Sequence, residues 1–393
     1  MCKYLPLSKI HVIFILPVLI ATSCIEEYWP KIDSQYVDAL VIDGGISNLP
    51  GPYEIKLSLS SEIYYNPVRP LRNCTVIIEE ESGTSEELVE IGEGVYRTSA
   101  DGIQGVCGKS YRIKIRTPDG KQYMSDFEEM PLPTPIDTIY YELEYQPHPF
   151  FDRNITGYRF FIDTQVSEID TNYYLWNLEC TYKFNANYRI KYYFDGQMHP
   201  FSPSDSLYTC FKTNNIKEIF LYNTANLEVP VVRRHPLNYV TTETKELSIK
   251  YSLLVKQFSL TKSTYEYWNK IKDLNDDQGE IYFKQPFQIK GNVYNSENKD
   301  ELVLGNFRVA GSSEKRIFID RPTGVDWYYP DSCNFYPIEK DILYINHSRW
   351  PLYLPGSYGE YGYGPAWVDY QWCVNCTAKG LDGYLEEPEF WEE

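Results

Sequence analysis

The sequence has little that points to catalysis. It contains no His-Glu-x-x-His metalloprotease motif, no Gly-x-x-x-x-Gly-Lys-Ser/Thr phosphate loop and no Gly-x-Gly-x-x-Gly dinucleotide fingerprint. The closest approach to a nucleophile elbow is "PGSYG", where Pro355 takes the place of the first glycine. Carboxylate pairs abound in an acidic chain and single out no glycosidase-like pair. We therefore expect a protein that is not an enzyme, with no catalytic residues and no cofactor; a hydrolase with an unrecognised carboxylate pair is the alternative.

Basic side chains are also scarce. The chain of 393 residues carries 37 Lys and Arg against 55 Asp and Glu, a formal net charge of −18. Such a surface repels phosphate backbones, so we expect no nucleic-acid partner. The acidic residues are spread along the chain, which favours an ordinary solvated surface.

Long apolar runs are absent except at the N-terminus. Lys3 and Lys9 give a positive start, residues 10–20 are mostly apolar, and residues 21–23 are small. This order is typical of a secretory signal. The run is shorter than the roughly 20 apolar residues of a spanning helix. We interpret residues 1–23 as a lipoprotein signal peptide.

Cys24 follows the small residues directly. Ala-Thr-Ser-Cys is similar to a bacterial lipobox, in which the cysteine is acylated and becomes the new N-terminus; Ala21 stands where leucine is usual. Several acyl chains, at about 0.8 kcal/mol per buried CH2, give a lasting membrane anchor. Glu26 and Glu27 look like the acidic signal that sends Bacteroidetes-type lipoproteins to the outer face of the outer membrane. We expect residues 24–35 to form a lipidated tether.

Seven cysteines remain after the signal and the lipidated residue: Cys74, Cys107, Cys180, Cys210, Cys333, Cys373 and Cys376. An exported chain meets an oxidising compartment, where disulfides form. Seven is odd, so at most three bridges are possible. The pairings that we consider are Cys74 with Cys107, Cys180 with Cys210, and Cys333 with Cys373 or Cys376.

Cys373 and Cys376 form the sharpest local pattern, Cys-x-x-Cys. A structural zinc site would need a second pair or histidines at ligand spacing. The exported chain offers four scattered histidines, His148, His199, His235 and His347. A thioredoxin-type motif would start a helix in a βαβ unit, whereas this one follows an aromatic, glycine-rich loop. We favour structural disulfides, with metal binding and redox activity as alternatives.

The segment 36–130 predicts short strands separated by turns. Apolar and polar residues alternate over residues 53–59, as in a half-buried strand. Thr-Pro-Asp-Gly at 117–120 predicts a hairpin turn. Strands at roughly ten-residue spacing without helices indicate a small β-sandwich. Three prolines in residues 131–136 predict an extended linker.

The segment 137–393 is rich in aromatic and β-branched residues, which strands prefer. One helix is predicted over residues 261–274, with Thr261 as a candidate N-cap. Four apolar residues fall on one face of that helix: Tyr265, Trp268, Ile271 and Leu274.

An acidic stretch, "DLNDDQGE" at residues 273–280, has the alternation of an EF-hand loop. Its glycine is at the seventh place instead of the sixth, and Lys284 stands where a bidentate glutamate is required. A helix that ends in an acidic turn explains the stretch better, so we expect no metal site.

The loop 349–372 is the most unusual segment, because aromatic residues alternate there with glycine and proline. Exposed aromatics of this kind serve sugar-stacking and protein-docking surfaces. The alternative is an irregular loop whose rings cover the core and which Cys373 and Cys376 tie down. The contact candidates are Trp350, Tyr353, Tyr358, Tyr361, Tyr363 and Trp367.

The combined pattern resembles a known family. The resemblance is carried by Cys24 with its acids and by three segments: "YRIKIRTPDGKQYMSDFEEMPLPTPIDTIYYE", "KQPFQIKGNVYNSENKDELVLGNFRVA" and "CVNCTAKGLDGYLEEPEFW". The family that the sequence resembles is a domain-of-unknown-function family of Bacteroidetes-type outer-membrane lipoproteins, often encoded beside TonB-dependent receptors. The chain departs from that pattern at Asn306, in "LGNF". Thr138 and Ser206 look like O-glycosylation sites of such bacteria.

The resemblance implies a mainly β fold. An Ig-like β-sandwich at 36–130 would be followed, after the proline linker 131–136, by a larger β-rich family domain at 137–393 with one or two short helices. It also implies a surface-exposed, lipid-anchored accessory of a TonB-dependent transport complex that captures or gates a glycan or peptide. A structural or adhesive surface protein without a transporter partner is the alternative.

Overall fold

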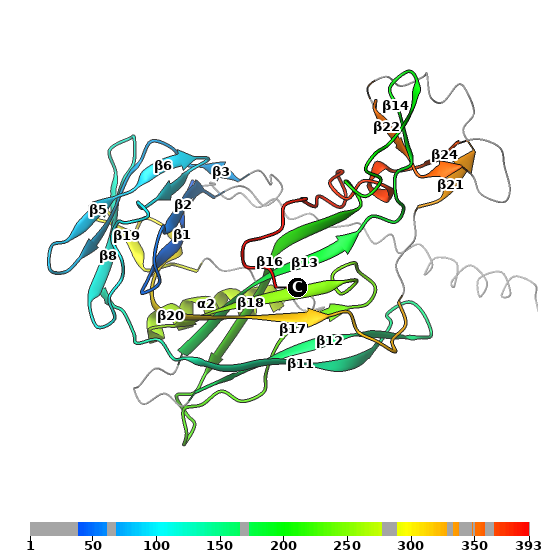
Figure 1. The fold of residues 1–393 in the computed structure, drawn as a ribbon. Coiled ribbons are helices and arrows are strands. Elements are labelled where there is room, and N and C mark those ends of the chain that lie inside the picture. The colour runs from blue at the N-terminus through cyan, green and yellow to red at the C-terminus, as the bar shows by residue number, and fades with distance from the viewer. Residues whose placement is uncertain are drawn as a thin grey trace, which may run out of the picture. The chain divides into compact units, whose positions relative to one another are not determined.

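The computed structural model describes residues 38–60, 68–165, 173–276, 289–327, 333–337, 348, 350–357 and 365–392. The chain divides into two units, residues 1–38 and 39–393, and nearly all described residues belong to the second. Cys24 and the signal lie outside the described residues. The described part is mainly β, as expected, with one α-helix (Figure 1). Within it, no helix has the length and apolar character needed to cross a membrane.

Two sheets enclose the first core. Inward-facing residues alternate along their strands, as in β8 (Ser110–Arg116), where Tyr111, Ile113 and Ile115 are buried. The first sheet contains β1 (Leu40–Ser47), β2 (Glu54–Leu59), β3 (Arg69–Pro70), β6 (Val89–Gly92) and β7 (Val95–Arg97). The second contains β4 (Thr75–Glu80), β5 (Ser85–Glu87), β8 (Ser110–Arg116), β9 (Gln122–Ser125), β10 (Glu128–Glu129) and β19 (Val293–Asn295).

Strand β20 (Val303–Asp320) joins this sandwich to the rest of the unit. Its first half pairs in parallel with β1, from Leu40 opposite Val303 to Ser47 opposite Ala310. Its second half pairs antiparallel with β18 (Lys250–Ser259), so one nine-stranded sheet runs through both parts. Phe307 of β20 and Val293 of β19 belong to the first core. The division into 36–130 and 137–393 stays a prediction; the N-terminal sandwich includes two strands from late in the chain, β19 and β20.

The second core lies between that nine-stranded sheet and a three-stranded sheet. The smaller sheet contains β11 (Ile136–Pro147), β12 (Asn154–Thr164) and β17 (His235–Thr241); the larger contributes β13 (Tyr173–Asn185), β16 (Thr209–Asn223), β18 and the end of β20. Trp176, Phe160 and Tyr251 are fully buried between them. Fully buried aromatic rings of this size supply much of the apolar surface that stabilises such a core.

The proline segment 131–136 is hydrogen-bonded to this core. Gln257 of β18 accepts a hydrogen bond from Trp176 Nε1 (2.8 Å) and donates from Nε2 to the Thr134 carbonyl oxygen (2.6 Å). The Thr134 N–H donates to Ser259 Oγ (3.1 Å). Buried polar groups are thus satisfied by the segment's own backbone, which fixes the path of the chain into β11.

Helix α2 (Lys262–Asp276) covers the other face of the large sheet. The Thr264 N–H donates to Thr261 Oγ1 (3.3 Å), which confirms Thr261 as the N-cap. Tyr265 and Trp268 pack against an apolar cluster from β13, β16, β18 and β20. Its buried members are Leu175, Leu221, Phe258, Leu260 and Ala310.

A small lobe follows, built from two three-stranded sheets (Figure 1). Their strands are β14 (Tyr192–Phe194), β15 (Met198–Pro200) and β22 (Leu352–Leu354), and β21 (Phe335–Pro337), β23 (Gly356–Ser357) and β24 (Pro365–Val368). The short 3-10 helix η3 (Gln371–Cys373) comes next. The lobe has only small apolar clusters of its own, such as Phe194, Leu352 and Leu354, and cross-links supply part of its stability.

Candidate functional site

Two disulfides hold the lobe. Cys333 bonds to Cys373, one of the two partners expected for it, with Cα atoms 5.7 Å apart. Cys210 of β16 bonds to Cys376, with Cα atoms 5.8 Å apart. The two cysteines of the Cys-x-x-Cys pattern thus go to different partners. The Cys210–Cys376 disulfide links the lobe to the large sheet, whereas the Cys333–Cys373 disulfide lies within the lobe. The described residues hold no group of three or more His, Cys, Asp or Glu that could bind a metal ion.

The expected Cys180–Cys210 disulfide is wrong. In the pairing of β13 with β16, Cys180 lies opposite Asn214 and Cys210 lies opposite Phe184. Four residues along a strand is about 13 Å, well beyond the roughly 7 Å that a disulfide can bridge. Cys180 is a buried free thiol, and burial raises its pKa to about 11.

The expected Cys74–Cys107 disulfide is also wrong. Cys74 precedes the start of β4, at the end of the ladder where Thr75 lies opposite Arg116. Cys107 precedes β8, at the other end of the ladder, about 17 Å away along the strands. Both are half-buried free thiols whose pKa is raised by burial.

The aromatic residues proposed as contacts are only partly described. Trp350 packs edge-to-face on Phe194, with ring centroids 5.3 Å apart, and Tyr353 packs similarly on Phe201 at 5.5 Å. These two rings therefore help to build the lobe. Trp367 lies in β24, and the other three candidates, Tyr358, Tyr361 and Tyr363, lie outside the described residues. Partner contact by these residues remains a prediction.

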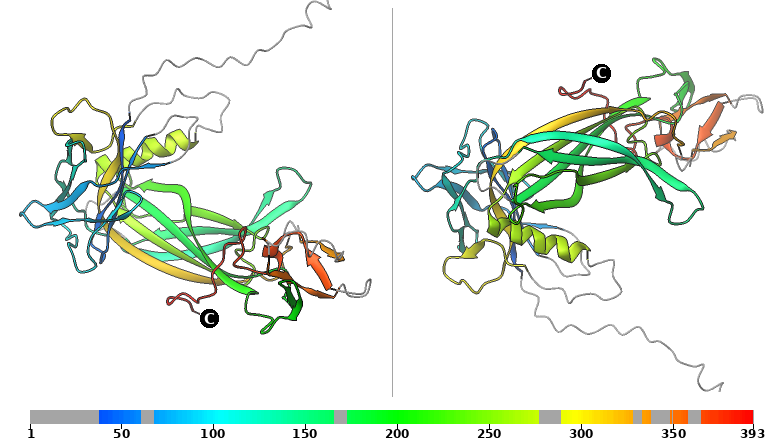
Figure 2. Two further views of the ribbon diagram at one scale, coloured as in Figure 1. Left: turned by 90° about the horizontal axis from the view of Figure 1, so that it is seen from above. Right: turned by 90° about the horizontal axis from the view of Figure 1, so that it is seen from below.

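The β11–β12 hairpin carries the exposed aromatic surface that the sequence did not reveal. Phe150 and Phe151, in the loop between the strands, are 86% and 63% exposed, and Tyr145 is 59% exposed. Tyr141 and Leu143 of β11 are exposed as well. Figure 2 shows the end of this hairpin standing clear of the neighbouring strands. An exposed apolar patch of this kind marks an interaction site more often than a solvated surface.

The alternation along β11 explains this exposure. Ile139 faces the second core and is buried. Tyr141, Leu143 and Tyr145 follow on the same face of the strand, but the core does not extend beneath them. Tyr158 of β12 supports this face, with its ring centroid 4.6 Å from that of Tyr141. Among the described strands β11 pairs only with β12, so it forms an edge of its three-stranded sheet.

The opposite face of the hairpin is polar and fixed by ion pairs. Arg234 Nη2 donates to Glu142 Oε2 (2.7 Å), and Arg159 Nε donates to Glu144 Oε2 (3.1 Å). These arginines lower the pKa of both carboxyl groups. Arg159 also lies over the ring of Tyr239, 4.9 Å from its centroid. These ion pairs neutralise Glu142 and Glu144. The apolar face is therefore the main exposed feature of the hairpin.

His148 orders the hairpin loop. Its Nδ1 accepts hydrogen bonds from the backbone N–H groups of Phe150 (3.0 Å) and Phe151 (3.2 Å). This leaves the proton on Nε2, which lies 3.8 Å from Glu243 Oε2. Arg153 Nη1 pairs with the same carboxylate (2.5 Å). The two phenylalanine rings are thus presented by an ordered turn.

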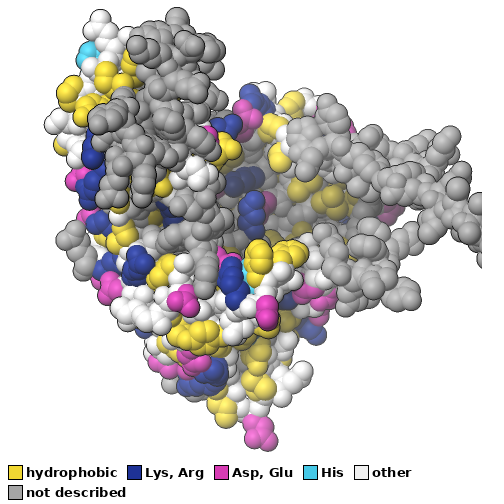
Figure 3. Space-filling view, turned by 90° about the vertical axis from the view of Figure 1, so that its right-hand side faces the viewer, with side chains coloured by type: hydrophobic (Ala, Val, Ile, Leu, Met, Phe, Trp, Pro, Cys, Tyr) yellow, Lys and Arg dark blue, Asp and Glu magenta, His cyan; other side chains and the backbone are white. Residues whose placement is uncertain are grey.

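Seen from the side of the hairpin loop and the lobe, hydrophobic side chains lie at the surface among charged ones (Figure 3). Protein interfaces commonly have large aromatic side chains at their centre and a polar, charged rim around them. Of the two candidate glycosylation sites, Ser206 is exposed in the loop after β15, whereas Thr138 is half-buried within β11.

The histidines of the described part lie apart from one another. His199 Nε2 is 3.0 Å from Asp195 Oδ1 in the lobe. His235 stacks on Trp176 and makes a tilted ring contact with Tyr222, with centroid distances of 4.8 and 5.0 Å, and burial lowers its pKa to about 4. Neither joins the hairpin loop with His148.

Comparison with known proteins gives a family but no activity. No curated protein matches the chain. A family described as a domain of unknown function (DUF4249) matches residues 25–316, which is well over half of the sequence. The chain belongs to the DUF4249 family.

Proposed function

We propose that this chain is a lipid-anchored outer-membrane protein, facing the cell exterior, that serves as a non-enzymatic accessory of a TonB-dependent transport complex. It would capture or gate a glycan or peptide ligand by contact with the transporter. Acylated Cys24 would provide the anchor, and Glu26 and Glu27 the export signal.

The observation that carries the proposal is the exposed hairpin. Phe150 and Phe151 are among the most exposed large apolar side chains of the described residues, and an ordered turn presents them. Such a surface is costly to leave in water and favours a partner that covers it. The resemblance to lipoproteins encoded beside TonB-dependent receptors suggests which partner to seek.

Co-purification from detergent-solubilised outer membranes tests this proposal. A transport receptor should be recovered with the tagged native chain, and a palmitate analogue should label the chain. Labelling that survives Cys24→Ala would contradict the lipid anchor. Isolation of the labelled chain without a receptor would contradict the accessory role and favour the structural or adhesive alternative.

A further inference from the structure

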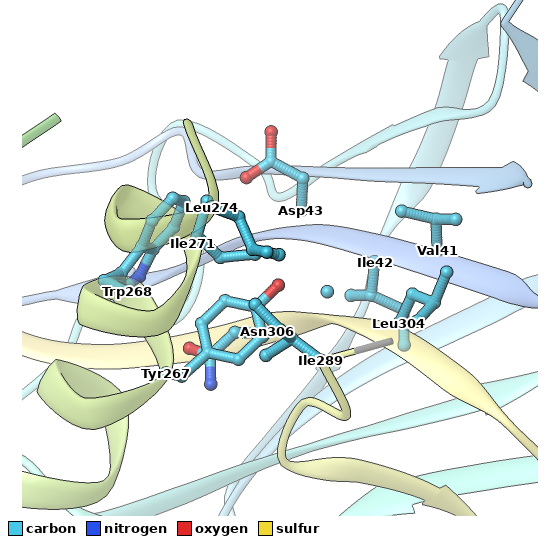
Figure 4. Close-up of a pocket in the computed structure, with 11 residues that line it drawn as sticks. Val41, Ile42, Asp43, Tyr267, Trp268, Ile271, Leu274, Ile289, Leu304 and Asn306 are labelled. Carbon is cyan, nitrogen blue, oxygen red and sulfur yellow. The ribbon is translucent and has the colours of Figure 1, made fainter. Parts of the chain in front are cut away.

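A cavity of about 420 Å³ lies between α2 and the strands β1 and β20 (Figure 4). The helix contributes Tyr267, Trp268 and Ile271 to its walls. The facing strands contribute Val41 and Leu304. Apolar walls with few polar groups are typical of small-molecule sites, which commonly measure roughly 300–1,000 Å³.

Strands β1 and β20 form the floor of this cavity. Residues of β20 alternate, so that Val303 and Phe307 face the sandwich core while Leu304 and Asn306 face the cavity. Gly305 has φ +88°, and a Cβ there would lie 1.8 Å from the Ile42 carbonyl oxygen. Only glycine permits this close approach of β1 and β20. The floor of the cavity is therefore formed by backbone that a larger residue would displace.

Two polar atoms of the wall lack partners. Asn306 is only 5% exposed, and its Oδ1 has no hydrogen-bond partner among the described residues. The indole N–H of Trp268 also lacks one within that part of the chain. An unpaired buried donor and acceptor in an apolar wall are unfavourable, and such groups call for a structural or functional reason. Asn306 and Trp268 both line the cavity, so a ligand held there could supply the missing partners.

The charges around the cavity favour an uncharged occupant. In Figure 4 the Asp43 carboxylate points away from the apolar side chains. Burial raises the pKa of Tyr267, and the charge of Asp43 adds to this effect, so the phenol stays protonated. An anionic ligand would be repelled by Asp43. A cation would have to give up its hydration for walls that are otherwise apolar, because the Asp43 carboxylate is directed away from the space.

We propose that this cavity binds a small, uncharged, mainly apolar molecule that carries one hydrogen-bond donor and one acceptor. An apolar cavity of roughly 150 Å³ holds benzene, so 420 Å³ admits a molecule of at least two fused rings. The ligand's donor pairs with Asn306 and its acceptor with Trp268. This site is separate from the β11–β12 hairpin and does not depend on the partner proposed for it.

A matched pair of probes tests the site: naphthalene-2-carboxamide, which has a donor and an acceptor, and 2-methylnaphthalene, which has neither. Calorimetry and ligand-observed NMR on the chain from residue 25 should show both binding, with the amide roughly fivefold to tenfold tighter. Ile271→Trp should weaken both by at least about tenfold by filling the cavity. Glu266→Trp adds the same side chain at an exposed position of α2 and should leave both affinities unchanged.

Asn306→Leu separates the polar contribution from the apolar one. This variant should keep 2-methylnaphthalene binding and lose the preference for the amide. Leu274→Trp replaces Ile271→Trp if thermal unfolding shows that the latter is not folded. Failure of the wild type to bind either probe, or binding that the cavity-filling variant leaves intact, would overturn the proposal. An amide preference that survives Asn306→Leu would overturn the assigned role of Asn306.

Discussion

Replacing Phe150 and Phe151 together by alanine should leave the fold intact. The rings are 86% and 63% exposed, and their interactions are confined to the loop, where the Phe151 ring lies 4.6 Å from that of His148. Surface substitutions of this kind change the free energy of unfolding by about 0.5 kcal/mol or less. The hydrogen bonds to His148 Nδ1 come from the backbone, so alanine preserves them.

The same double substitution should strongly weaken partner binding. Burying a phenylalanine side chain contributes about 1.5–3 kcal/mol. Scaled by the exposed fractions of the two rings, complete burial in an interface contributes about 2.2–4.5 kcal/mol. That free energy corresponds to a loss of affinity of roughly 40-fold to 1,600-fold.

The assay is quantitative recovery of the partner from solubilised outer membranes, together with thermal unfolding of each variant. Val89→Ala with Ile91→Ala is the matched control, since these residues are also exposed and apolar but lie on β6. Equal recovery with the hairpin variant and the wild type would refute the reasoning. Equal loss with both double variants would show that the hairpin is not the specific contact.

Three further results are expected. Removing the Cys333–Cys373 disulfide by serine substitution at both positions should lower the free energy of unfolding by about 3–4 kcal/mol, because the bond closes a loop with a sequence separation of 40. Urea unfolding under oxidising conditions measures this change. Burial lowers the pKa of His235 to about 4 in the folded chain. Between about pH 6.5 and pH 4 the unfolded chain therefore binds a proton at this residue that the folded chain does not bind. The free energy of unfolding should fall as the pH drops through that window. His235→Phe should flatten this part of the stability profile, and an unchanged profile would argue against a neutral buried ring. In native protein the Cys180 thiol, buried and with its pKa raised to about 11, should resist alkylation at pH 8 until the chain unfolds, while the two half-buried free thiols react first.

Local patterns were sufficient to predict the fold class and several elements. The alternation over residues 53–59 corresponds to β2 (Glu54–Leu59), whose Ile55 and Leu57 face the core. Thr261 caps the predicted helix because its side chain competes well for the first free N–H groups. These features depend on neighbours within a few residues, which the sequence displays directly.

Long-range pairing could not be predicted in the same way. Leu40 lies opposite Val303, and no local signal indicates that these two strands meet in parallel. The disulfides depend on the same information, since the register of β13 and β16 separates Cys180 from Cys210. Phe307 shows the same limit, because it completes a core whose other residues come mostly from the first third of the chain.

The exposed hairpin was missed because exposure depends on what lies beneath a strand. The alternation of β11 is that of a half-buried strand, and only the extent of the facing sheet decides that Tyr141 and Tyr145 are exposed. A usable signal was present in "HPFF", where two phenylalanines follow a proline in a turn. Apolar residues in a short polar turn are seldom needed for packing.

Photo-crosslinking from position 150 tests the central claim most directly. A benzophenone side chain replaces Phe150 in the full chain in its native cells, and the same group at Val89 is the control, since that side chain is also well exposed. The account predicts a covalent adduct between position 150 and an outer-membrane transport receptor, identified by mass spectrometry and absent from the Val89 position. No adduct at position 150, or equal adducts at both positions, would contradict it.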